Sequence, residues 1–168
     1  MQIPRFLTLA MSSEQQLAES FLQVANKHEK NAGVRDMCKQ LAHWSRNHVT
    51  ALGPLIDRFG GKEDDEPERV RSALFHGMRI GGLGVLRDLE DLSLLARQAE
   101  LHWTCLEQAG KAAQDSDLES VCSRCKIETE RQLSWLTTQI KQTAPQALIV
   151  DPDKAATIKA SVPKTPTP

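Results

Sequence analysis

Hydrophobic residues recur along this chain at the three- and four-residue spacing of helices that bury one face. The clearest runs lie between Leu83 and Lys141, on either side of the polar turn Asp115-Ser116-Asp117. Because a short connection makes neighbouring helices antiparallel, these two runs predict a helical hairpin whose apolar faces form half of a core. The positions concerned are Val85, Leu92, Leu95, Ala99, Trp103 and Leu106, followed by Leu118, Val121, Cys122, Cys125, Leu133, Leu136 and Ile140.

The residues before this hairpin predict a second pair of helices. Ser12 and Ser13 precede Glu14 in the pattern of a helix N-cap, so we expect the first helix to begin there. Asn31-Ala32-Gly33 predicts its end, and the next periodic run predicts a helix from about Val34 to Phe59. The stretch from there to the third helix is too long for a tight turn and predicts a crossover.

Composition and length predict one soluble all-α domain. We expect an N-terminal segment at 1–12, a four-helix bundle at 13–144, and an extended or disordered tail at 145–168, rich in proline, threonine and lysine. A net charge of -1 provides no basic excess for nucleic acid or a membrane surface. The apolar N-terminal stretch is too short for a signal peptide or a membrane span, which favours a cytoplasmic location.

Several polar residues share the apolar faces and are candidates for a buried site: Glu14, His28, Ser45, His48, Asp88, Thr129 and Gln132. A buried polar side chain needs hydrogen-bond partners. The simplest interpretation makes His28 and His48 core histidines, with Ser45, Thr129 and Gln132 bonded to His48 along the bundle axis.

A helix pair, a long crossover and a second helix pair form the connectivity of ferritin-like bundles. The chain from Ser13 to Gln142 resembles that superfamily, as do the runs Gly84-Val85-Leu86-Arg87-Asp88-Leu89 and Gln132-Leu133-Ser134-Trp135-Leu136. The resemblance implies a four-helix bundle that holds two irons, with a Glu from each of two helices and a Glu-x-x-His pair from each of the others.

The iron-binding motifs are degenerate in this chain. Ser45-Arg46-Asn47-His48 keeps the histidine but has serine in place of glutamate, and Thr129-Glu130-Arg131-Gln132 lacks both ligand types. Glu128 is expected about 90° from the centre of its apolar face, away from the bundle axis.

Two metal sites remain as alternatives. Iron would use a reduced set of ligands, His28, His48, Glu14 and Asp88. Zinc would use His102, Cys105, Cys122 and Cys125, two i, i+3 pairs on antiparallel helices that supply thiolates and an imidazole.

The sequence therefore favours a non-catalytic structural or interaction module with a degenerate di-iron site and no cofactor. The alternative is a metal-binding oxidoreductase or iron-handling protein. Trp44 and Trp135 lie at the edges of their apolar faces, where subunit contacts often form, so a homodimer is expected.

Overall fold

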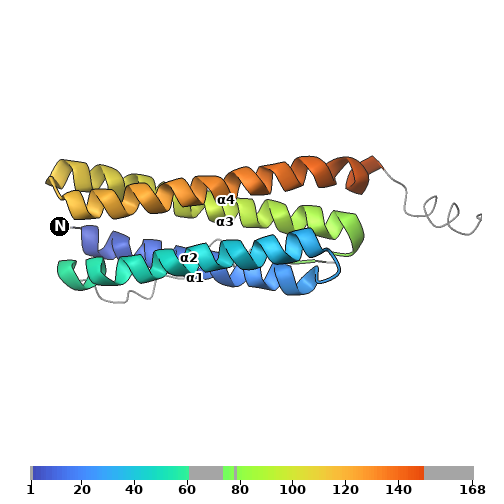
Figure 1. Ribbon diagram of the computed structural model, residues 1–168, viewed down its shortest axis with the longest axis horizontal. Coiled ribbons are helices and arrows are strands. Elements are labelled where there is room, and N and C mark those ends of the chain that lie inside the picture. Colours follow the sequence, from blue (N-terminus) through green and yellow to red (C-terminus); the bar gives the residue numbers. More distant parts are fainter. Residues whose placement is uncertain (1, 61–73, 78, 150–168) are drawn as a thin grey trace, which may run out of the picture.

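Two helical hairpins pack against each other along their lengths (Figure 1). The computed structural model describes residues 2–60, 74–77 and 79–149. The first hairpin contains α1 (Ile3–Lys27) and α2 (Ala32–Phe59), and the second contains α3 (Gly81–Ala113) and α4 (Ser116–Ile149). The prediction of an all-α four-helix bundle is confirmed. None of the helices in the described ranges combines the length and the apolar character needed to cross a membrane.

The direction of the helices agrees with the predicted crossover. Figure 1 shows that α2 and α3 run the same way, so α3 begins at the end of the bundle opposite to the one where α2 ends. The two hairpins meet mainly through α1 and α3, whereas α2 and α4 contact each other much less. One edge of the bundle is therefore loosely joined.

The first helix begins well before the predicted cap at Ser12 and Ser13. It starts at Ile3, and Pro4 occupies its first turn, where the missing amide proton costs no hydrogen bond. Leu7 and Ala10 are buried and continue the apolar face. The predicted boundary after residue 12 is therefore wrong, because this segment adds to the core.

The last helix also extends beyond its predicted end at Thr143-Ala144-Pro145. It runs to Ile149 with the exposed Pro145 inside it. The prediction that this proline ends the bundle is wrong. The tail was predicted over 145–168, and its part from residue 150 onward lies outside the described residues.

The turn between α3 and α4 is tighter than predicted. Gln114 adopts a left-handed conformation with φ 55°, and Oδ1 of Asp115 accepts a hydrogen bond of 3.0 Å from the amide of Leu118. This cap starts α4 at Ser116 and fixes the register of the hairpin.

The core consists of two apolar clusters separated by a polar layer. One cluster, toward the end where α1 meets α2, includes Leu17, Leu41 and Leu92. The other, toward the turn between α3 and α4, includes Leu7, Leu52, Trp103, Cys122 and Cys125. Between them lie the buried polar residues Glu14, Ser45, His48, Thr129 and Gln132.

Candidate functional site

The polar layer contains a hydrogen-bonded chain contributed by all four helices. Nδ1 of His48 on α2 lies 3.0 Å from Oε1 of Glu14 on α1, and its Nε2 lies 2.9 Å from Oε2 of Glu128 on α4. Nε1 of Trp103 on α3 donates to the same Oε1 of Glu14 at 2.7 Å. Glu14 is 0% exposed and His48 1% exposed. The His48 side chain is thus held between two carboxylates inside the protein.

This geometry favours a charged imidazole. A carboxylate oxygen only accepts hydrogen bonds, so His48 must donate from both ring nitrogens to satisfy Glu14 and Glu128. An imidazole that does so carries a positive charge. Burial lowers the pKa of His48, but hydrogen bonds and charge from Glu14 and Glu128 outweigh that effect, and its pKa lies above the usual value.

The remaining polar residues of the layer form hydrogen bonds that do not include His48. Nε2 of Gln132 donates to Oγ of Ser45 and to the carbonyl oxygen of Leu41, each at 3.1 Å. Oγ1 of Thr129 donates to the carbonyl of Cys125 in its own helix. The inward placement of Ser45, Thr129 and Gln132 is confirmed, but the prediction that they bond to His48 is wrong. In the described part of the chain, Oε2 of Glu14 and Oε1 of Gln132 are buried and accept no hydrogen bond.

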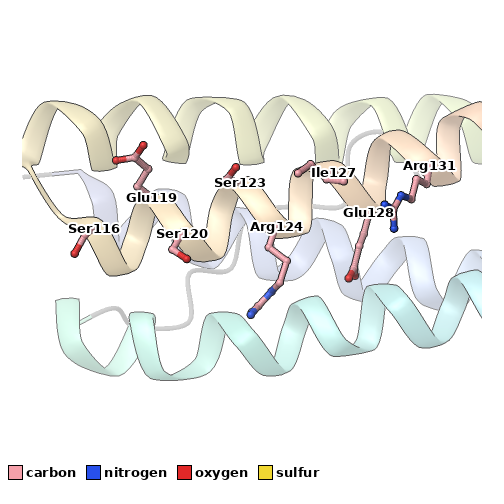
Figure 2. Close-up of a pocket in the computed structure, with 8 residues that line it drawn as sticks. All are labelled: Ser116, Glu119, Ser120, Ser123, Arg124, Ile127, Glu128 and Arg131. Atoms are coloured by element: carbon pink, nitrogen blue, oxygen red, sulfur yellow. The ribbon is translucent and has the colours of Figure 1, made fainter.

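Glu128 is the functional residue that the sequence pattern missed. Its backbone position is off the apolar face, as predicted, and its side chain is 34% exposed. Its long side chain nevertheless extends from α4 toward α2, as does that of Arg124 (Figure 2). It reaches His48 across the loosely joined edge. The prediction that Glu128 cannot reach the axis is wrong because helical phase ignores side-chain length.

A shallow depression runs along the surface of α4. It has a volume of about 620 Å³ and is lined entirely by α4, from Ser116 to Arg131 (Figure 2). Glu128 belongs both to this depression and to the chain that reaches His48. It is the surface-facing end of the buried network.

A second polar cluster surrounds Asp88, which is 0% exposed. Its carboxylate accepts from Nε2 of His28 at 2.7 Å and pairs with Nζ of Lys27 at 3.0 Å and Nη1 of Arg79 at 2.8 Å. Nη1 of Arg79 also lies 2.7 Å from Oδ2 of Asp91. These bonds hold the residues just before α3 against α3 itself and join α3 to the C-terminal end of α1, which is a structural role.

The four predicted iron ligands are divided between these two clusters. Glu14 and His48 belong to the polar layer, and His28 and Asp88 belong to the second cluster. Glu14 and His28 lie fourteen residues apart on α1, a rise of about 21 Å along the helix. They cannot bind one metal ion together.

The four predicted zinc ligands are not assembled either. Cys105 is exposed, whereas Cys122 and Cys125 are buried among apolar side chains, and burial raises the pKa of each buried thiol to about 12. Zinc binds the thiolate, which such burial disfavours. The ring of His102 meets the ring of Phe6 edge-on. Over the described ranges as a whole, no three His, Cys, Asp or Glu side chains are grouped so as to hold a metal ion.

Comparisons with protein-family models, with curated proteins and with solved structures found no match to this chain.

Proposed function

We propose that this protein is a ferritin-like bundle that acts as a non-catalytic structural or interaction module. The observation that supports this proposal is that both ring nitrogens of His48 are bonded to carboxylates of the protein itself. In the metal-binding bundles that the sequence resembles, a histidine in such a layer supplies a nitrogen to iron. Here the same side chain joins α1 to α4.

The side chains of the layer do not fit the two-iron site that the resemblance implies. A doubly protonated imidazole has no lone pair to offer a metal. Glu14 and Glu128 lie against opposite nitrogens of the His48 ring, so their bonded oxygens are not placed to bridge two ions. Ser45 and Gln132 bond to each other where carboxylates would be needed.

The same layer suits a role in specifying the fold. Glu14, His48, Trp103 and Glu128 each come from a different helix, so their bonds form together in one alignment of the four. Sliding one helix by a turn would leave a buried carboxylate or imidazole without a partner, which costs more than an apolar mismatch. The layer thus fixes the axial register of the bundle.

Metal analysis tests this proposal directly. Protein purified without chelator should contain iron and zinc far below one atom per chain, and ferrous iron added in air should be oxidised no faster than in buffer alone. His48→Leu serves as the matched control. Stoichiometric iron in the wild type that disappears in this variant would overturn the proposal.

A second candidate function is an iron-handling protein or a metal-binding oxidoreductase. It has one observation in its favour, the buried Oε2 of Glu14, which accepts no hydrogen bond from the described residues. A buried carboxylate oxygen of this kind is a suitable cation ligand. The metal analysis above separates the two functions.

We also propose a cytoplasmic location and a homodimer. Trp44 and Trp135, which the sequence placed at possible subunit contacts, are half-buried and pack against the cluster that contains Leu41. The exposed large apolar side chains lie elsewhere, and three of them, Leu83, Leu94 and Leu101, are on α3.

A further inference from the structure

The outer face of α3 carries apolar side chains that none of the described residues covers. Leu94 is 56% exposed and Leu101 54% exposed. They lie seven residues apart, so they share one side of the helix, directly opposite its buried face. Leu83, 49% exposed, and the exposed Cys105 continue this stripe at either end. A leucine stripe over several turns resembles the contact face of a helix pair more than scattered surface leucines do.

Two opposite charges lie along one flank of this stripe, one before Leu94 in the sequence and one after it. Glu90, four residues before it, and Arg97, three residues after it, are exposed and lie on the same flank of the stripe. Arg97 also pairs with Glu100 at 2.9 Å. The acidic group therefore precedes Leu94 and the basic group follows it.

We propose that this face binds the same face of a second copy of the chain, with the two α3 helices antiparallel and Leu94 at the two-fold axis. In that arrangement positions before Leu94 face positions after Leu94 in the other copy. Glu90 then lies level with Arg97 of the second copy, on the same flank, and symmetry creates this pair twice. The face is complementary to itself.

The rest of the stripe matches in the same register. Arg87 is seven residues before Leu94 and Leu101 seven residues after it, so the aliphatic part of each arginine covers a leucine of the other copy. Leu83 and Cys105 are each eleven residues from Leu94 and also face each other. A parallel pairing would instead place Glu90 and Arg97 of one copy on the opposite flank from those of the other copy, so neither of these attractive pairs would form.

This inference goes beyond the proposed function, because self-association through α3 requires nothing of the polar layer around His48. A full-length chain that proves monomeric would defeat it, together with the homodimer proposed above, and would leave the non-catalytic function untouched. Metal bound at His48 would have the reverse effect.

Sedimentation velocity of the full-length chain over a hundredfold range of concentration is the first test. The wild type should form a dimer. Leu94→Glu places two carboxylates at the axis and should raise the dimer dissociation constant about 30-fold or more, as expected for a central contact residue. Leu148→Glu, at an exposed leucine near the end of α4, is the matched control and should leave the dimer intact. A wild type that stays monomeric, or a dimer insensitive to Leu94→Glu, would overturn the proposal.

Charge reversal tests the register. Glu90→Arg alone should weaken the dimer on the order of 10-fold because two attractions become two repulsions, and adding Arg97→Glu should restore it. Circular dichroism checks that each variant keeps its helices. In a Cys105→Ser background, Leu94→Cys should give an intermolecular disulfide under mild oxidation, whereas Gln108→Cys, far from the axis, should not. The absence of charge rescue together with equal cross-linking at both positions would rule out this register.

Discussion

Replacing His48 with leucine tests whether charge holds the polar layer together. Leucine fills much of the same volume but donates no hydrogen bond. Glu128, at 34% exposed, can turn toward solvent, whereas Glu14 is fully buried and keeps only the indole of Trp103. Removing one partner of a buried ion pair costs about 3–5 kcal/mol, so His48→Leu should lower the free energy of unfolding by that amount.

The matched variant is Glu14→Gln, which removes the buried charge and keeps an oxygen to accept from Trp103. Alone it should cost about 1–2 kcal/mol, since His48 can still donate to Glu128 and to the amide oxygen that takes the place of Oε1. In this background His48→Leu strands no charge and should also cost about 1–2 kcal/mol. The two positions should therefore be coupled by about 2–3 kcal/mol.

Urea unfolding followed by circular dichroism near neutral pH measures all four forms of this cycle. Equal helical signal and equal slopes with urea would show that the variants share one native state. The reasoning fails if His48→Leu costs less than about 1 kcal/mol, or if the two single costs simply add in the double variant.

Three further predictions concern separate parts of the molecule. Glu14 and Glu128 raise the pKa of His48, so the stability that this side chain contributes should be complete below the ordinary histidine pKa of about 6.5 and fall as the pH rises through the raised pKa. Urea unfolding midpoints at several pH values should show this fall in the wild type and not in His48→Leu. At mildly alkaline pH, and at a protein concentration low enough to keep the chain monomeric, a thiol reagent should modify the exposed Cys105 quickly and the other three cysteines only after unfolding. Gly84→Ala should cost about 1–3 kcal/mol in urea unfolding, because its Cβ would lie 2.4 Å from the carbonyl carbon of Arg79.

Each of these predictions has an internal check. Gly53 lies within α2 with no atom of another part of the chain within 4 Å of an added Cβ, and crowding against the next residue, Pro54, offsets the helix preference of alanine, so Gly53→Ala should change the free energy of unfolding by less than about 1 kcal/mol. A loss there as large as at Gly84 would show that the close approach is not the cause. Rapid modification of all four thiols in the folded protein would contradict the burial of three. A parallel pH profile in His48→Leu would assign the pH effect to other groups.

The sequence predicted the inward positions of the site well, since helical phase decides which side of a helix faces the core. Glu14, Ser45, His48, Thr129 and Gln132 were all placed inward and are all buried. The spacing of Leu7 and Ala10, which continues that of Glu14 and Leu17, would have indicated the earlier start of α1. The predicted start rested instead on the cap-like serines, which lie within the helix.

The partners inside the site could not be predicted in the same way. A pattern of 100° per residue gives direction but neither side-chain reach nor the spacing between helices. Glu128 bonds to His48 because its side chain is long and the edge between α2 and α4 is open. Trp103 was assigned to the apolar core, where it lies, yet its indole N–H also bonds to Glu14.

The loose edge between α2 and α4 has a consequence for motion. Because α1 and α3 provide most of the contact between the hairpins, α4 can swing away from α2 about that contact while every helix stays intact. Among the described residues, such an opening breaks bonds made by side chains: those of Glu128 with His48, of Gln132 with α2, and of Arg58 with Asp115 and Asp117. Backbone amide exchange would not register it, since intrahelical hydrogen bonds survive. Exchange of the imidazole protons of His48 with solvent would register it, so the rate of that exchange reports how often the edge between α2 and α4 opens.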